Sequence, residues 1–214
     1  MTMPKALEQD RIRDIYDHFG ARQDDQAWYE DEALAVLLRD GGFEGADVVV
    51  EFGCGTGRFA EMLLKQRLGP QARYVGVDIS RTMVDLARKR LEPWGERAQV
   101  RLSEGDLDLP AADVIVATYV LDLLSEEDID AFLEAARAAL KPGGRLCIAG
   151  LTSERGALNR LWSVLYRLIP ATLGGCRPMA LGRHLRRRRW TLRTAEIVST
   201  FGLASEAVVA SPRD

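Results

Sequence analysis

The stretch Val48-Val-Val-Glu-Phe-Gly-Cys-Gly-Thr-Gly-Arg-Phe-Ala60 decides how the rest of the chain is interpreted. Its β-branched run predicts a strand that is buried on both faces of a parallel sheet. The three alternating glycines predict a tight turn, and a helical pattern follows them. Such a turn lets a ligand approach the backbone, and the start of the helix offers free N–H groups. The stretch therefore predicts a ligand-binding loop between a strand and a helix.

The spacing of the glycines narrows the choice of ligand. A Walker loop ends in Gly-Lys-Ser/Thr, whereas Gly57 is followed by Arg58 and Phe59. The dinucleotide fingerprint G-x-G-x-x-G would place its third glycine at Arg58. The chain has G-x-G-x-G instead, with Glu51 before the first glycine. A carboxylate there disfavours a pyrophosphate and favours a ligand with a cationic amino-acid part. A glycine-rich turn without a ligand is the alternative.

Composition sets the broad class of protein. The chain has 214 residues and a net charge of −3, which predict one α/β domain with no general affinity for nucleic acid. Three scattered cysteines and two histidines predict reduced thiols and no metal site. The longest apolar runs, such as 114–120, are far shorter than the roughly 20 residues that cross a bilayer. We therefore expect a soluble, cytoplasmic protein without a signal sequence.

Strands and helices alternate on both sides of the glycine-rich loop. Helices are expected at 5–20, 28–38, 56–66, 80–91 and 125–140, and strands at 46–51, 73–78, 100–103, 113–118 and 145–151. This alternation predicts an α/β fold with a doubly wound, mostly parallel sheet and helices on both faces. Ligands of such sheets bind beyond the carboxyl ends of the strands, which is where the loop lies.

Acidic residues end three successive predicted strands. Asp78 is placed to grip the two ribose hydroxyls of an adenosine, and Asp106 to accept from an adenine amine, with Leu107 covering the ring. Glu51 is the third. Any one of these acids, taken alone, is compatible with a solvated loop. Three of them at successive strand ends favour a nucleoside-binding edge.

Four segments together resemble the class I S-adenosylmethionine-dependent methyltransferases. They are Glu51-Phe-Gly-Cys-Gly-Thr-Gly57, Gly76-Val-Asp78-Ile-Ser80-Arg-Thr-Met83, Gly105-Asp106 and Leu140-Lys-Pro-Gly-Gly144. Within the family, the chain is most similar to the ubiquinone and menaquinone biosynthesis group, mainly over residues 46–151. The resemblance implies a Rossmann-like seven-stranded sheet whose last strand is antiparallel. The sixth strand would be 190–198 and the seventh 205–210, with a helix at 194–201 as the alternative.

The resemblance also implies one methyltransferase domain spanning 1–214, in which successive segments have different roles. Residues 1–42 would form a helical lid, 43–151 the cofactor-binding core, 152–189 an acceptor cap insertion and 190–214 the C-terminal strands. The cofactor would be S-adenosylmethionine, with S-adenosylhomocysteine as product. The residues implied for its site are Glu51, Gly53, Cys54, Gly55, Thr56, Gly57, Asp78, Ile79, Met83, Asp106, Leu107, Thr118 and Tyr16.

Different residues of this set would bind different parts of the cofactor. Glu51 and the glycine loop would hold its methionine part, and Asp78 its ribose. Thr118 would lie beside the methyl group, and Tyr16 in the lid. Met83 would pack on the adenine, with ordinary helix packing as the alternative.

The acceptor side is indicated less directly. Tyr119 and Asp122 follow the fourth strand and are candidate catalytic residues that face the acceptor, although Asp122 also suits a helix cap or the surface. An apolar helical pattern within 152–178 predicts a roof over a hydrophobic small-molecule acceptor, or else a helix that covers the core. Arg183 and the run 186–189 suit a solvated face, an anionic acceptor, a membrane surface or RNA.

Small-molecule methyl transfer is the leading interpretation of the sequence. A nicotinamide-dependent oxidoreductase would share the sheet, but the glycine spacing and Glu51 disfavour it. RNA methylation ranks lower, because no aromatic-interleaved basic surface or appended RNA-binding module supports it, and protein methylation is a further alternative. A catalytically idle cofactor-binding protein is the remaining alternative. We therefore expect a small-molecule partner, no nucleic acid, and peripheral membrane contact at most.

Overall fold

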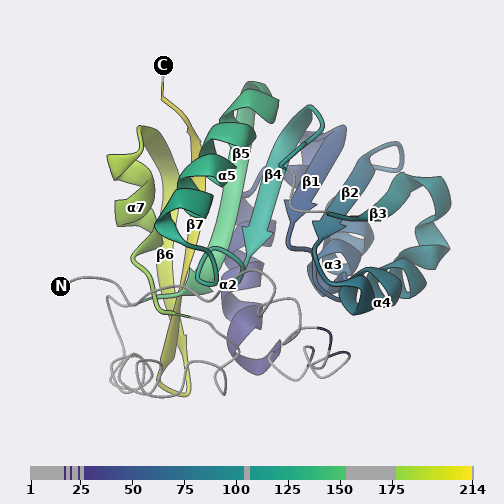
Figure 1. Ribbon diagram of the computed structural model, residues 1–214, viewed down its shortest axis with the longest axis horizontal. Coiled ribbons are helices and arrows are strands. Elements are labelled where there is room, and N and C mark those ends of the chain that lie inside the picture. Colours follow the sequence, from purple (N-terminus) through teal and green to yellow (C-terminus); the bar gives the residue numbers. More distant parts are fainter. Residues whose placement is uncertain are drawn as a thin grey trace.

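The computed structural model of the chain describes residues 17, 20, 24, 27–103, 107–152 and 177–213, in which helices flank one sheet (Figure 1). The strands are β1 (Val48–Phe52), β2 (Arg73–Asp78), β3 (Ala98–Leu102), β4 (Ala112–Thr118), β5 (Leu140–Leu151), β6 (Trp190–Thr200) and β7 (Leu203–Pro212). The α-helices are α2 (Ala27–Asp40), α3 (Arg58–Gln66), α4 (Arg81–Leu91), α5 (Glu126–Ala139) and α7 (Leu181–Arg187). Short 3-10 turns lie at Phe43–Gly45 and Glu92–Arg97.

The sheet has the topology expected from the sequence. Its seven strands follow the order β3-β2-β1-β4-β5-β7-β6. The first five are parallel to one another, and β7 is antiparallel to both β5 and β6. The predicted α/β fold with an antiparallel last strand is confirmed. Strand order reverses between β1 and β4, so this is the edge where a ligand is expected.

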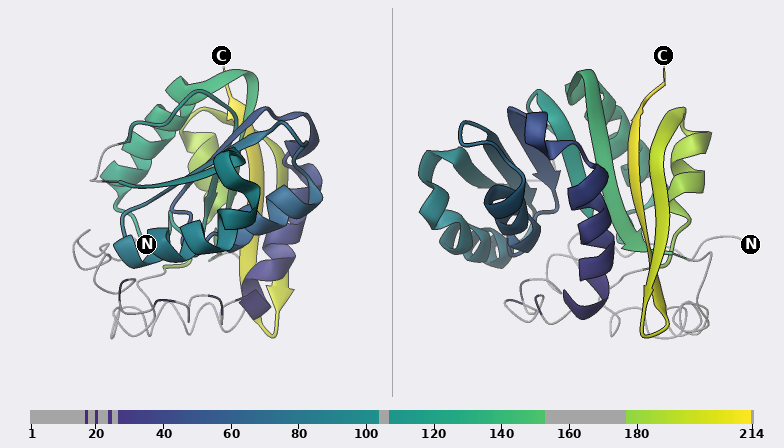
Figure 2. Two further views of the ribbon diagram at one scale, coloured as in Figure 1. Left: turned by 90° about the vertical axis from the view of Figure 1, so that its right-hand side faces the viewer. Right: turned by 180° about the vertical axis from the view of Figure 1, so that it is seen from behind.

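Helices lie against both faces of the sheet (Figure 2), and an apolar layer of side chains holds them on each face. On one face α2, α3 and α4 bury side chains such as Leu37, Leu63 and Val84 in one core cluster. On the other face α5 and α7 bury side chains such as Phe132 and Leu185 in a second cluster. Helices therefore cover both faces, as expected for a doubly wound sheet.

The sixth strand expected at 190–198 is confirmed, and it extends to residue 200. Residues 190–200 pair with β7 along almost their whole length, so a helix over 194–201 is wrong. Thr191, Arg193 and other alternate side chains of the segment point outward, which is the period of a strand. Pairing with β7 decides the conformation, because it satisfies the backbone groups along one side of this edge strand.

Several boundaries shift by a few residues from those expected. The helix after the glycine loop begins at Arg58 instead of Thr56, because Gly57 takes a left-handed conformation with φ 76° as its N-cap. The third strand begins at Ala98, and the fifth already at Leu140. The helices expected at 5–20 and within 152–178 lie outside the described residues. No helix in the described ranges is long and apolar enough to cross a membrane.

Candidate functional site

A cleft lies at the carboxyl ends of β1 and β4, at the reversal of strand order. Its lining residues are Asp24, Glu30, Leu34, Glu51, Gly53, Cys54, Gly55, Thr56, Arg58, Phe59, Thr118 and Tyr119. Seven of the residues singled out in the sequence therefore come together here, from the end of β1, the glycine loop and the end of β4. Asp24, Glu30 and Arg58 are additional charged groups that the sequence motifs did not indicate.

The backbone of the glycine loop is shaped to accept a ligand. A Cβ added at Gly55, which has a φ of 52°, would meet no atom within 4 Å, so the loop presents open backbone there. Gly57 is needed for another reason, because its Cβ would lie 3.2 Å from the backbone of Ala87 in α4. One glycine thus leaves space for a ligand, and the other brings α3 and α4 together.

Asp78 lies at the end of β2 and is joined to the loop by hydrogen bonds. Its Oδ2 accepts a hydrogen bond of 2.8 Å from the Gly55 N–H, and its Oδ1 one of 2.9 Å from the Ser80 N–H. Burial raises the pKa of Asp78, although these N–H groups oppose the shift. Each oxygen of a carboxylate has two lone-pair directions, so both retain acceptor capacity for hydroxyl groups.

Glu51 is a buried carboxyl group between two hydroxyl donors. The Tyr74 hydroxyl donates to its Oε2 at 2.6 Å, and the Thr118 hydroxyl donates to its Oε1 at 3.3 Å. Burial raises the pKa of Glu51 to about 7. The Tyr74 hydroxyl has room because Gly76 stands beside it, where a Cβ would come within 2.8 Å of that oxygen. The Glu51 carboxyl group therefore gains or loses its charge near neutral pH, because its burial in the cleft raises its pKa.

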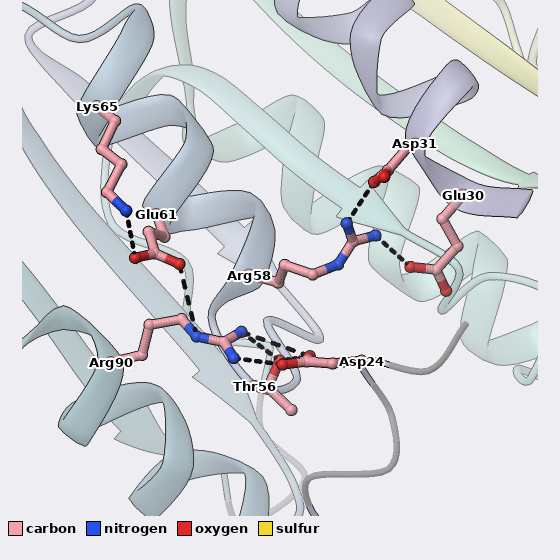
Figure 3. A network of polar contacts seen from close by, with 8 residues as sticks. All are labelled: Asp24, Glu30, Asp31, Thr56, Arg58, Glu61, Lys65 and Arg90. Carbon is pink, nitrogen blue, oxygen red and sulfur yellow. Dashed lines mark hydrogen bonds and ion pairs between the residues drawn. The ribbon is translucent and has the colours of Figure 1, made fainter. Parts of the chain in front are cut away.

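Ion pairs connect the cleft to α2 and α4 (Figure 3). Arg58, the first residue of α3, pairs with Glu30 at 2.7 Å and also contacts Asp31. Asp24 accepts a hydrogen bond of 2.6 Å from the Thr56 hydroxyl and pairs with Arg90. Glu30 is 7% exposed, and its burial raises its pKa. Three acids and one guanidinium line the cleft, so it is an acidic site with a single basic group among the described residues.

The two candidate catalytic residues have different surroundings. Tyr119 lines the cleft in a left-handed conformation with φ 53°, which is rare for a residue with a bulky side chain. Its hydroxyl donates to Ser205 Oγ at 2.9 Å, and burial raises its pKa. Asp122 is only 1% exposed, so its alternative as a surface residue is wrong. It is not among the residues that line the cleft.

The remaining expected site residues either do not line the cleft or lie outside the described residues. Met83 is buried in α4, and its N–H donates to Ser80 Oγ. Ile79 packs against the core beneath α2, α3 and α4. Leu107 is described but does not line the cleft. Tyr16 and Asp106 lie outside the described residues.

One member of the arginine run has a structural role. Arg188 donates to Glu126 at 2.8 Å and also pairs with Asp130, so it holds the end of α7 against α5. Arg186, Arg187 and Arg189 are exposed. The interpretation of the run as a solvated face therefore holds for these three and not for Arg188.

Comparison with known proteins agrees with the fold and the glycine loop. Residues 50–146 match the family model described as a methyltransferase domain. Demethylmenaquinone methyltransferase of Lactobacillus johnsonii is 28% identical over 131 residues, which cover 59% of this chain and 53% of that protein. The chain spans about half the length of such curated relatives.

Two solved structures resemble the whole chain. The cyclase SpnF has a TM-score of 0.76 at 17% identity, with 99% of each chain covered. The Burkholderia thailandensis 1,6-didemethyltoxoflavin-N1-methyltransferase, solved with that acceptor and S-adenosylhomocysteine, has a TM-score of 0.72 at 20% identity and covers 100% and 94%. At these identities the likeness shows a common fold, while activity depends on the residues of the site.

Proposed function

We propose that this chain is a class I S-adenosylmethionine-dependent methyltransferase and that it transfers a methyl group to a small, hydrophobic acceptor. The observation that carries the proposal is the cleft lined by the glycine loop and Glu51, with Asp78 hydrogen-bonded to that loop at Gly55. A demethylmenaquinone methyltransferase among the relatives supports an apolar acceptor.

The charges of the cleft fit the cofactor. S-adenosylmethionine carries a sulfonium and an ammonium group, which suit Glu30 and Glu51. Its carboxylate suits Arg58, the cleft's basic group within the described chain. The open backbone at Gly55 lets the methionine part lie against the loop, and Asp78 has acceptor capacity for two ribose hydroxyls.

The residues act chiefly by alignment. When bound, the cofactor supplies a methyl group that is already activated on sulfur. The chain then has to orient donor and acceptor in line and to exclude water. Thr118 and Tyr119 stand at the end of β4, on the wall of the cleft where the acceptor would approach.

We assign Tyr119 to acceptor contact rather than to proton abstraction. Its hydroxyl donates to Ser205, and burial disfavours its anion. Asp122 stays a candidate base only if the acceptor reaches beyond the described cleft. An acceptor whose reacting atom is nucleophilic without a base requires neither residue to move a proton.

Calorimetric titration tests the cofactor first. The protein should bind S-adenosylmethionine and S-adenosylhomocysteine and should not bind NAD. Asp78→Ala removes a charge-assisted pair of hydrogen bonds worth about 1.5–3 kcal/mol, so affinity should fall about 10- to 150-fold. Asp85→Ala is the matched control, because Asp85 is an exposed carboxylate of α4 with one distant partner, Arg88.

Each outcome has a distinct meaning. Binding of NAD alone would overturn the methyltransferase proposal. Wild-type affinity in Asp78→Ala would refute the placement of the ribose and leave the cofactor intact. Methyl transfer to a hydrophobic phenol or quinol in an acceptor screen would separate an active enzyme from an idle cofactor-binding protein.

A further inference from the structure

A row of aromatic side chains runs from the cleft to the surface. Tyr119 packs edge-on against Tyr29 with 5.8 Å between ring centres, and Tyr29 against Trp28 at 5.2 Å. Trp28 in turn lies 6.0 Å from Phe201. Tyr119 and Tyr29 are buried, whereas Trp28 is 48% and Phe201 85% exposed. We call Trp28 and Phe201 the aromatic pair.

Folding does not explain the aromatic pair. These two are the exposed large apolar side chains of the described residues. Phe201 occupies the β6–β7 turn with φ 48°, next to Gly202 with φ 86°. Two successive positive φ angles are typical of a hairpin turn that favours Asn-Gly. A phenylalanine there adds strain and buries little of its ring, so its side chain is better explained by a ligand.

The aromatic pair lies on the side of the sheet where the cleft opens. The β6–β7 turn and the first turn of α2 both project beyond the carboxyl ends of the parallel strands, as both views agree (Figures 1 and 2). The buried Tyr29 links the pair to Tyr119, which lines the cleft. The pair itself does not line the cleft, but ring packing through Tyr29 connects it to the cleft wall.

Resting on the proposed function, we propose that Trp28 and Phe201 form an aromatic subsite for the apolar end of the methyl acceptor, the end away from the transferred methyl group. A flat or hydrocarbon group suits this pair, because both rings offer apolar faces and the pair contributes no charge. The acidic cleft takes the cofactor, and the aromatic pair takes the acceptor's apolar part. Specificity for acceptor length and apolarity follows from this separation.

Two phenols that differ only in chain length test the subsite. We would measure the affinities of 4-ethylphenol and 4-hexylphenol by calorimetry in the presence of S-adenosylhomocysteine. The wild-type protein should bind the hexyl compound more tightly. Phe201→Asn and Trp28→Ala should each weaken the hexyl compound about 3- to 10-fold and leave the ethyl compound and S-adenosylhomocysteine unchanged. Asn suits the left-handed turn, so Phe201→Asn removes the ring without disturbing the fold.

The opposite results overturn the subsite. Equal affinity for the two phenols, or no selective loss in Phe201→Asn, would refute it while binding of S-adenosylhomocysteine keeps the proposed function. Loss of phosphatidylglycerol vesicle binding in Phe201→Asn, with unchanged phenol affinities, would make the pair a lipid contact and would also refute it. Absence of S-adenosylhomocysteine binding in the wild-type protein would refute the proposed function itself.

Discussion

The Glu51 carboxyl group is buried, yet it keeps two hydroxyl donors. Burial disfavours its charge by more than the donors from Tyr74 and Thr118 favour it, and its pKa is about 7. A cationic ligand in the cleft would reverse this balance, because an opposite charge nearby favours the carboxylate. Glu51 would then lose a proton when a cationic cofactor binds near neutral pH.

Glu51→Gln should remove a pH-dependent part of the stability. The folded-state pKa of about 7 exceeds the ordinary 4.5, so the contribution of Glu51 is complete below pH 4.5 and is lost as the pH rises through 7. The native protein should lose up to about 3 kcal/mol relative to the variant across this range. Urea unfolding of both proteins at pH 5 and pH 8 measures the difference.

Tyr74→Phe sharpens the test at the same carboxyl group. It removes the donor to Glu51, so the pKa should rise further and the loss of stability should occur at higher pH. A stability difference between the native protein and the Glu51→Gln variant that is the same at both pH values would contradict the assignment.

Local capping signals, which can be recognised in the sequence, determine where helices begin. Ser125 caps α5: its Oγ accepts from the Asp128 N–H at 3.0 Å, and its hydroxyl donates to the Asp128 carboxylate at 2.7 Å. The pair resembles a capping box and satisfies an N–H group at the helix start. β6 is the opposite case, because its conformation depends on pairing with β7.

Ser125→Ala should destabilise the protein by about 1 kcal/mol, because α5 loses its cap. For a chain of this size the melting temperature should fall by about 2–4 °C. Ser125→Thr is the matched control, because threonine also caps helices, and it should lose much less. Equal melting temperatures for the Ala and Thr variants would show that the cap contributes nothing. Thermal unfolding followed by circular dichroism measures all three proteins.

Helices on one face of the sheet are joined across the cleft by the ion pairs of Figure 3. α2 packs on β5, β6 and β7, while α3 and α4 pack near β2 and β3. Arg58 joins α2 to α3, and Arg90 joins α4 to Asp24 and Thr56. The cleft wall is thus assembled from segments far apart in the sequence.

Arg58→Ala should destabilise the protein by about 2 kcal/mol, because it leaves the Glu30 carboxylate buried beside no guanidinium. Lys65→Ala breaks an exposed pair with Glu61 and should cost less than about 0.5 kcal/mol. Adding Glu30→Gln to Arg58→Ala should restore part of the loss, since it removes the buried charge. Urea unfolding at two salt concentrations measures the free energy of unfolding of each variant. Equal losses of stability in Arg58→Ala and Lys65→Ala would refute a special contribution of the Arg58–Glu30 ion pair.

The motifs alone located the strand–loop–helix unit, the acids Glu51 and Asp78, and the alternating fold. They succeeded because glycine spacing, strand period and residue chemistry are local properties of the chain. Only the tertiary structure placed Asp24, Glu30 and Arg58 in the cleft, excluded the alternative helix at 194–201 and showed that Asp122 is buried. Burial and long-range pairing decide these features, because they depend on neighbours that no local pattern records.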